Sequence, residues 1–251
     1  MEINREHVKQ TFAKYVANYD VNDEKVKLKI DHTYRVADLC DEIATSIDLS
    51  AEDVDLAWLC GMLHDIGRFE QLRRYGTFID AESVDHALLG AKILFEDNRI
   101  YDYIENPPKQ ICEFLEKVVA CHSAYRIPEE YDIRTKMFAD ILRDADKIDI
   151  LKVNVEVPLE EIYNVTSEEL RNAEVTKEVM ESFAQKKAIL RALKKTPVDH
   201  VVGHISLVFE LVYPRSVEIV KEQGYLEKLL NFESLNPKTM EQFKQLKNVM
   251  E

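Results

Sequence analysis

Glycine and proline are scarce in this chain of 251 residues, which contains six of the former and seven of the latter. Both residues interrupt helices, so their scarcity, together with abundant Glu, Lys, Leu and Ala, favours helix almost throughout. No apolar run approaches the roughly 18 residues of a membrane span, and the first residues lack the apolar segment of a signal peptide. We therefore expect a mostly helical, cytoplasmic protein without a membrane partner.

Cysteine residues are also few, and positively charged residues are fewer than negatively charged ones. The chain has 33 Lys and Arg against 47 Asp and Glu, which gives a formal net charge of -14. A binder of nucleic-acid backbone needs clustered Lys and Arg, so long nucleic acid is disfavoured as a partner, whereas a small anionic substrate is not. The four thiols show no CxxC spacing, so reduced core thiols are expected. They are Cys40, Cys60, Cys112 and Cys121.

Start and stop signals divide the chain into predicted helices. Ser50-Ala-Glu-Asp53 has the spacing of a capping box, and breaks are expected at Gly76, at Asn106-Pro107-Pro108 and at Thr196-Pro197. No alternating strand pattern and no internal repeat are present, so the expected fold class is all-α. Residues 152–165 look irregular. The predicted helices cover residues 3–19, 24–47, 51–65, 69–75, 82–96, 109–123, 134–151, 166–187, 198–212, 214–222 and 236–249.

Several histidines lie on apolar faces of these predicted helices. At about 100° per residue, His32 falls beside Val36, and His122 lies near the centre of its apolar stripe. His86 shares a face with Leu89. The helix that ends at His64 is apolar almost all round and should be buried. Burying a His or Asp costs several kcal/mol unless it is hydrogen-bonded, paired or bound to metal.

A single histidine of this kind is more often a satisfied core residue than a ligand. Six polar groups on five helices, however, would satisfy one another by converging on metals, and imidazole and carboxylate suit Fe, Mn, Co, Ni or Zn. On the last of these helices the projection ranks Asp149 ahead of Asp146. The candidate metal ligands are His32, His64, Asp65, His86, His122 and Asp146.

The order of these motifs resembles the HD superfamily of metal-dependent phosphohydrolases, which is named for its His-Asp pair. Leu63-His-Asp-Ile-Gly-Arg68 is similar to the central signature of the family, although Lys is frequent where this chain has Arg68. Asp144-Ala-Asp146 is similar to the closing motif, and this resemblance implies Asp146 as the ligand over Asp149. The chain lacks the GYP motif of the cyclic-dinucleotide phosphodiesterases.

The resemblance covers about residues 24–152 and implies an HD core of about five helices. We expect the C-terminal helices, at about 166–251, to pack on this core as a layer, so that residues 1–251 form a single helical domain. A second domain is the alternative. The apolar segment 205–213 suits the core better than a dimer surface, which leaves a homodimer open.

His86 and His122 resemble the additional histidines of the binuclear HD subgroup, which implies two divalent transition metals. We assign Asp65 to both metals as a bridge. Two metals about 3.5–4 Å apart would lower the pKa of a shared water and so make it a nucleophile. One metal would take His32, His64, Asp65 and Asp146, and the other would take Asp65, His86 and His122.

The implied activity is hydrolysis of a small phosphorylated, nucleotide-like substrate. Arg68, one helical turn after the His-Asp pair, is favoured for phosphate contact, whereas for Arg73 an ion pair with Glu70 is at least as consistent. The expected catalytic residues are Asp65, Arg68 and Lys147. The expected substrate-binding residues are Arg68, Arg73 and Arg126.

Two other functions share the same ligand set. HD-type di-iron oxygenases use these six ligands to activate oxygen, and a catalytically silent HD module would bind a ligand without turnover. Outside this set, His200 and His204 are one turn apart and have metal-like spacing, but no acidic residue is close to them in sequence. We interpret these two as structural or interfacial.

Overall fold

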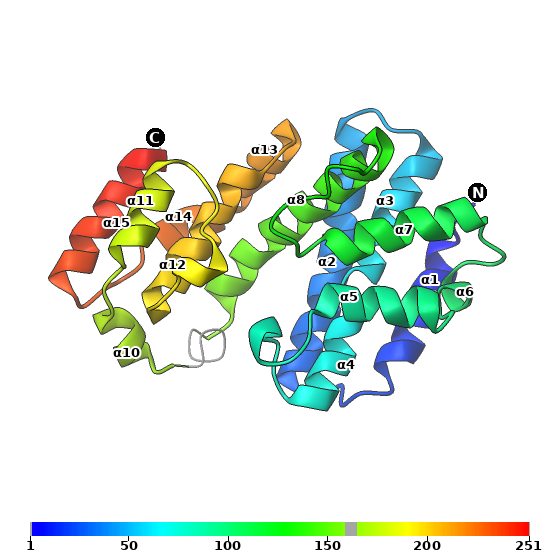
Figure 1. Cartoon of the computed structure of the whole chain (residues 1–251), viewed down its shortest axis with the longest axis horizontal. Helices are drawn as coiled ribbons and strands as arrows, with labels where there is room; N and C mark the ends of the chain where they lie inside the picture. Colours follow the sequence, from blue (N-terminus) through cyan, green and yellow to red (C-terminus); the bar gives the residue numbers. More distant parts are fainter. Residues whose placement is uncertain (1, 159–164, 251) are drawn as a thin grey trace. The chain divides into compact units, whose positions relative to one another are not determined.

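The computed structural model describes residues 2–158 and 165–250, and every regular element in these ranges is helical (Figure 1). The all-α prediction is therefore confirmed. The chain divides into two compact units, residues 1–146 and 147–251, and the boundary falls inside one long helix, α8 (Ile133–Glu156). The expectation of a single domain over 1–251 stays a prediction.

The N-terminal unit holds the predicted ligands on helices that closely follow the sequence prediction. The helix predicted over 82–96 begins later, at His86, and its second half is a π-helical segment, Lys92–Glu96. Residues 152–156 were expected to be irregular but continue α8, so that part of the prediction is wrong. The elements are α1 (Arg5–Val16), α2 (Glu24–Ser46), α3 (Ala51–Leu63), α4 (Ile66–Tyr75), a 3-10 turn (Asp80–Glu82), α5 (His86–Ala91), α6 (Ile100–Tyr103), α7 (Lys109–Cys121) and the first part of α8.

Local caps explain where several of these helices begin and end. The side chains of Asp23 and Ser50 accept hydrogen bonds from main-chain N–H groups in the first turns of α2 and α3. Gly76 has a φ of 69°, the left-handed conformation that glycine adopts without strain, and it ends α4 where the sequence predicted a break. The short helix α6 has no clear start signal and was not predicted.

Two glycines allow the helices of the N-terminal unit to approach closely. A Cβ atom on Gly61 would lie 2.5 Å from the Cα of Ala37, so α3 packs directly against α2. A Cβ atom on Gly67 would lie 2.1 Å from the carbonyl oxygen of His86, so α4 packs directly against α5. Trp58 and the other apolar residues of α3 are buried, as its all-round apolarity predicted. The junction between α3 and α4 therefore lies between α2 and α5.

The C-terminal unit consists of shorter helices. The single helix predicted over 166–187 is two helices, because the chain is extended at Ala173 and Thr176, and the Thr176 N–H donates to Asp199 at 2.8 Å. The helix α14 was not predicted. The elements are α10 (Ser167–Asn172), α11 (Lys177–Ala184), a 3-10 turn (Arg191–Leu193), α12 (Pro197–Ile205), a 3-10 segment (Ser206–Glu210), α13 (Pro214–Gln223), α14 (Tyr225–Leu230) and α15 (Pro237–Met250).

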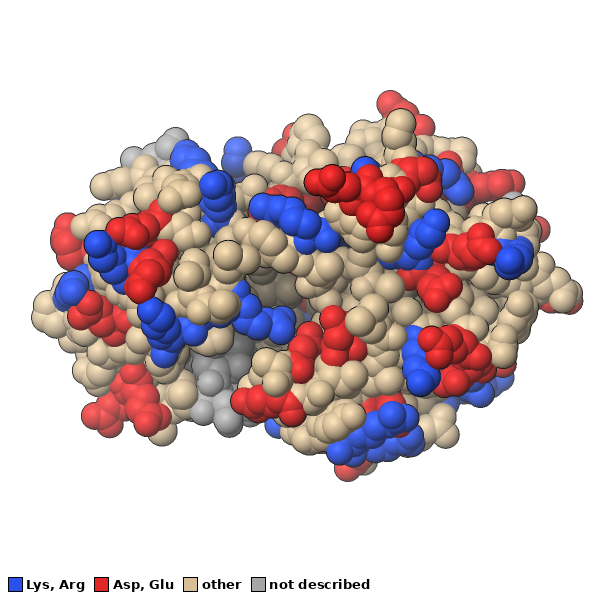
Figure 2. Space-filling view, in the orientation of Figure 1, with Lys and Arg blue, Asp and Glu red and all other residues tan. Residues whose placement is uncertain are grey.

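The helices of the described part of the chain are all too short or too polar to cross a membrane. Cys40, Cys60 and Cys121 are buried, and Cys112 is partly exposed. On the face drawn in Figure 2, Lys and Arg side chains lie interspersed with Asp and Glu.

Candidate metal centre

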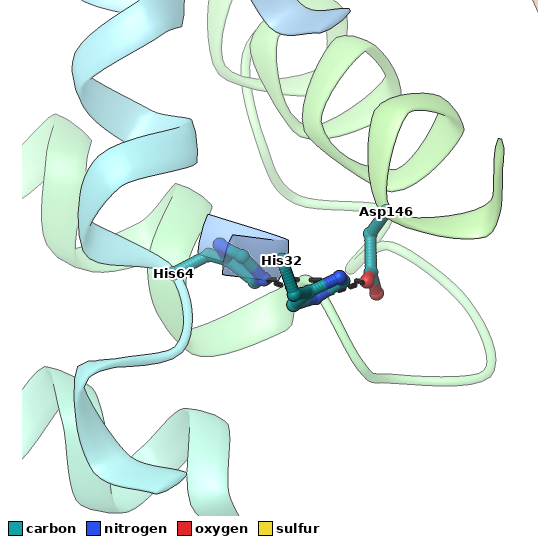
Figure 3. A group of neighbouring side chains, drawn as sticks. All are labelled: His32, His64 and Asp146. Atoms are coloured by element: carbon teal, nitrogen blue, oxygen red, sulfur yellow. Dashed lines mark hydrogen bonds and ion pairs between the residues drawn. The ribbon is translucent and has the colours of Figure 1, made fainter. Parts of the chain in front are cut away.

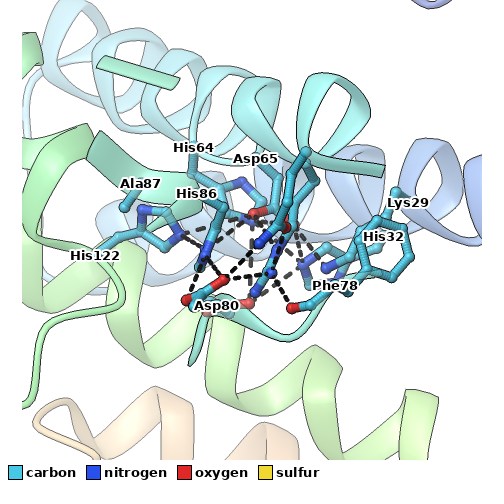
Figure 4. Close-up of polar contacts among 12 residues, drawn as sticks. Lys29, His32, His64, Asp65, Phe78, Asp80, His86, Ala87 and His122 are labelled. Carbon is cyan, nitrogen blue, oxygen red and sulfur yellow. Dashed lines mark hydrogen bonds and ion pairs between the residues drawn. The ribbon is translucent and has the colours of Figure 1, made fainter. Parts of the chain in front are cut away.

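The structure brings all six predicted metal ligands together in the N-terminal unit. The four histidines come from four helices, and each is at most 4% exposed. His32 lies on α2, His64 follows α3, His86 begins α5, and His122 follows α7. Asp65 lies at the start of α4, and Asp146 lies on α8 (Figures 3 and 4). The convergence expected from the apolar helix faces is therefore present.

Asp65 lies between two pairs of histidines. Its Oδ2 atom is 3.5 Å from the Nε2 atoms of both His32 and His64. Its Oδ1 atom is 3.5 Å from Nε2 of His86 and 3.8 Å from Nε2 of His122. Each carboxylate oxygen thus faces one histidine pair, as a bridging ligand would.

Hydrogen bonds fix the tautomers of three rings. Nδ1 of His64 donates to the Gly61 carbonyl, and Nδ1 of His122 donates to the Val119 carbonyl, both at 2.7 Å. Nδ1 of His86 donates to the carboxylate of Asp80 at 2.9 Å. Because these oxygens can only accept, the proton of each neutral ring lies on Nδ1, and Nε2 carries a free lone pair.

These lone pairs face one another across short distances. Nε2 of His86 is 3.1 Å from Nε2 of His122, and Nε2 of His32 is 3.2 Å from Nε2 of His64. Two ligand atoms that each lie about 2.0–2.1 Å from one metal are separated by about 3.0–3.4 Å at angles of about 90–109°. Facing lone pairs repel each other unless a cation lies between them, so the donor set and its spacing fit a divalent transition metal.

The protonation states also suit metal binding. Burial lowers the pKa of His64 to about 3, and the nearby Asp65 offsets only part of this effect. Burial, followed by the charge of Arg68, lowers the pKa of His86 to about 4. Burial alone would raise the pKa of Asp65, but Lys29 and the histidines hold it well below its usual value. Neutral rings and an ionised carboxylate are the forms that coordinate metals.

Asp146 rather than Asp149 joins this cluster. Its Oδ1 atom lies 3.2 Å from Nε2 of His32 and 4.0 Å from Nε2 of His64 (Figure 3). Among the described residues, Asp146 belongs to a group of metal-ligand type with these two histidines, and Asp149 does not. Asp149 is 2% exposed and the Asp146 side chain 18%. The helical projection therefore selected the more buried of the two aspartates, and not the one that lies close to the histidines.

Sequence reasoning missed two residues of the site, Lys29 and Asp80. The Lys29 ammonium donates to Oδ2 of Asp65 at 2.7 Å (Figure 4). Its position three residues before His32 on α2 was a usable signal, since such residues share a helix face. Asp80 accepts from His86 and from Gln71, the latter at 2.9 Å. It lies in the connection between α4 and α5, where no periodic pattern points to it.

Arg68 lies at the site, one turn after Asp65. Its Nη1 group donates to the Phe78 carbonyl at 2.6 Å and to Asp80 at 2.9 Å. Its Nε group is 3.7 Å from Oδ1 of Asp65, and this buried nitrogen has no hydrogen-bond acceptor within residues 2–158 and 165–250. Arg68 therefore retains a hydrogen-bond donor beside the carboxylate of Asp65.

The other predicted cations have different surroundings. Arg73 forms an ion pair of 2.5 Å with Glu70 and lies over the ring of Tyr19. Arg126 lies over the ring of Tyr125, with 4.3 Å between its guanidinium carbon and the ring centroid. Lys147 donates to the Glu210 carbonyl at 3.3 Å within the C-terminal unit. Substrate binding by Arg73 and Arg126 and catalysis by Lys147 stay predictions.

Histidines and aspartates converge in this helical core through unprotonated Nε2 atoms and carboxylate oxygens. Such a core is typical of metal-binding α-helical proteins. Residues 30–151 match the family model of the HD domain, and this range includes all six ligands. This part of the chain is therefore an HD domain, and proteins with this domain are generally metal-dependent phosphohydrolases. No curated protein and no solved structure matches the chain.

Proposed function

We propose that this protein is a phosphohydrolase that uses two divalent transition metals to hydrolyse a small phosphate ester or a nucleotide-like substrate. The observation that carries the proposal is the position of Asp65, with one oxygen facing His32 and His64 and the other facing His86 and His122. A single metal would need only one of these pairs. When bound, two such metals lower the pKa of a shared water towards neutrality and supply the nucleophile.

The chain's own residues would hold and orient the reacting groups. Asp65 would join the two halves of the site, and Asp146 would complete the half formed by His32 and His64. Asp80, through its hydrogen bond to Nδ1 of His86, would keep Nε2 of that ring directed at the site. Supporting carboxylates of this kind commonly determine how tightly a histidine holds its metal.

Two cations would receive the phosphoryl group. Lys29 and Arg68 lie on either side of Asp65, and their side chains are 17% and 15% exposed. The unpartnered Nε of Arg68 would donate to a phosphoryl oxygen as charge develops there. One well-placed donor of this kind typically lowers a barrier by about 3 kcal/mol. Side chains that are so deeply placed favour a compact phosphate ester over a polymer.

The test is elemental analysis of anaerobically purified protein, followed by a panel of phosphomonoesters and nucleotides with the identified metal restored. We expect two metals per chain, with phosphate release abolished by His64→Ala. His7→Ala is the matched control, because His7 is an exposed histidine of the same unit that contacts the Asp102 carbonyl. Its substitution should leave phosphate release unchanged.

Other results would contradict parts of the proposal. One metal per chain would rule out the binuclear site. Two irons, with oxygen-dependent substrate oxidation and no phosphate release, would identify the HD-type di-iron oxygenase instead. A protein that binds metal but converts no substrate, whichever metal is supplied, would be a silent ligand-binding module.

A further inference from the structure

Gln71 connects α4 to the segment that leads to His86. Its side chain is fully buried, with 0% of its surface exposed. Nε2 donates to Oδ1 of Asp80 and to Oγ of Ser83, both at 2.9 Å, and to the carbonyl of Val84 at 3.0 Å. These three acceptors share the two protons of one amide group. All three lie between α4 and α5, so Gln71 holds this connection both near its middle and at its end.

Ser83 and Val84 link this contact to the first turn of α5. The Ser83 hydroxyl donates to a main-chain carbonyl of the same connection at 2.9 Å, so its oxygen is left to accept from Gln71. The Val84 carbonyl immediately precedes Asp85, which is the N-cap of α5, and His86 is the first residue of that helix. Gln71 therefore fixes where α5 begins, and with it the backbone position of His86.

A closed triangle of hydrogen bonds joins Gln71, Arg68 and Asp80. Nη1 of Arg68 donates to Oε1 of Gln71 at 2.8 Å and to Oδ1 of Asp80 at 2.9 Å. Gln71 donates to the same oxygen of Asp80. Arg68 and Gln71 are three residues apart and share a face of α4. Because an amide group both accepts and donates, Gln71 holds the guanidinium through its oxygen and the carboxylate through its nitrogen.

The Asp80 carboxylate transmits this restraint to the ring of His86. It accepts from Nδ1 of His86 at 2.9 Å (Figure 4). Nε2 of the same ring lies 3.5 Å from Oδ1 of Asp65 and 3.1 Å from Nε2 of His122. A carboxylate that accepts from one nitrogen of a metal-binding histidine sets the direction of the other nitrogen. Any movement of Asp80 would therefore redirect Nε2 of His86.

We propose that Gln71 is a positioning residue of the metal centre, which holds Asp80 and the start of α5 and thereby directs Nε2 of His86 towards the metal shared with His122. The hydrogen bonds of the Gln71 side chain within residues 2–158 and 165–250 reach none of the six candidate ligands, so it acts only through other residues. The orientation of His86 is a property of the chain itself. The effect on metal affinity rests on the proposed binuclear function.

The first test observes the Nδ1–H proton of His86 by NMR in chelator-treated, full-length protein at pH 7. Gln71→Met keeps an unbranched side chain of the same length and removes its hydrogen bonds. We expect the His86 signal, which is identified by its loss in His86→Gln, to shift upfield because the hydrogen bond to Asp80 loosens. The Nδ1–H signals of His64 and His122, which donate to main-chain carbonyls, should stay in place.

The second test is isothermal titration of Mn²⁺ into the same chelator-treated proteins. We expect Gln71→Met to lower the affinity of one of the two sites by about tenfold, the lower end of the range for residues that orient a metal-binding histidine. Gln110→Met is the matched control, because Gln110 is exposed on α7, the helix that leads to His122. It should change neither affinity by more than about twofold and should leave the His86 signal in place.

Three results would overturn the proposal. The first is an unchanged His86 signal in Gln71→Met. The second is an equal shift of all three histidine signals, which would show a general loosening of the N-terminal unit. The third is an unchanged affinity of both sites in a protein that binds two metals. If the wild type binds fewer than two metals, the proposed binuclear function fails, and the NMR signals still decide the role of Gln71.

A second variant covers the case in which Gln71→Met does not fold. Gln71→Glu has the shape of the natural side chain and keeps the acceptor for Arg68, but it puts an oxygen where Nε2 donated to Asp80. We expect the same upfield shift of the His86 signal alone. An unchanged His86 signal in this variant would equally contradict the proposal.

Discussion

The ammonium of Lys29 lies 2.7 Å from Oδ2 of Asp65, the same oxygen that faces His32 and His64. A cation of the protein is thus already paired with the carboxylate that we propose as the bridge between the two metals. Any metal at this histidine pair must share Asp65 with Lys29 or displace it. This relationship gives the first of four predictions.

Replacing Lys29 with Met should tighten metal binding. The substitution removes a positive charge that repels a dication and competes for Oδ2 of Asp65, so we expect about tenfold higher affinity for Mn²⁺. Isothermal titration of the metal-free protein measures this directly. Lys27→Met, at an exposed position of the same helix, should leave the affinity unchanged. Weaker binding in Lys29→Met would mean instead that Lys29 holds Asp65 in its ligand position.

Replacing Asp80 with Asn should weaken one metal site selectively. Asp80 orients His86 through Nδ1, and loss of such a supporting carboxylate typically lowers metal affinity by about 10–100-fold. In a two-site metal titration, we expect only the transition of the weaker site to shift, towards higher metal concentration. Asp85→Asn makes the same charge change next to His86, and Asn also caps a helix, so it should have little effect. Equal effects of the two variants would argue against a role for Asp80 in orienting the ring.

Replacing Arg143 with Met should destabilise the N-terminal unit. Arg143 is 7% exposed and donates to the carbonyls of Cys121, His122, Ala124 and Tyr125. It thus supplies hydrogen-bond donors to carbonyl groups at the C-terminal end of α7, where His122 lies. We expect a loss of about 3 kcal/mol in the free energy of unfolding by urea.

The comparison for Arg143 is Lys109→Met, at the other end of α7. Lys109 is 88% exposed and pairs with Glu113, so its loss should change the free energy of unfolding by less than about 0.5 kcal/mol. A similar small change in Arg143→Met would show that the carbonyls at the end of α7 do not need the guanidinium.

The partly buried Lys194 should make stability depend on alkaline pH. Burial, followed by the charge of Arg191, lowers its pKa in the folded protein to about 8, from 10.5. Between these values the unfolded chain binds more protons, so the free energy of unfolding rises with pH. Below pH 8 the cost of the buried charge is constant, and above pH 10.5 it disappears.

Lys194→Met removes that cost. We expect it to be more stable than the wild type by about 3 kcal/mol at pH 7, with the difference vanishing towards pH 10.5. Urea unfolding at pH 7, 9 and 10.5 measures the trend. Lys195→Met should show no such trend, and a pH-independent difference for Lys194→Met would mean that the lysine is not charged at a cost in the folded state.

The sequence by itself determined the helices and most of the candidate metal ligands, because both depend on local order along the chain. The apolar stripe around His122 and the all-round apolarity before His64 follow from the helical repeat alone, and each required the polar ring to be buried. The capping signal at Ser50 and the stop at Gly76 act within one turn and were therefore visible without a structure.

Only the tertiary structure decided which groups meet, because contacts between helices that are distant in sequence leave no periodic signal. The convergence of Asp146 rather than Asp149 on His32 depends on how α8 meets α2, and the break before α11 depends on the hydrogen bond from Thr176 to Asp199. The place of Asp80 depends on the close approach of α4 and α5 that Gly67 permits, and this approach also brings His86 to Asp65.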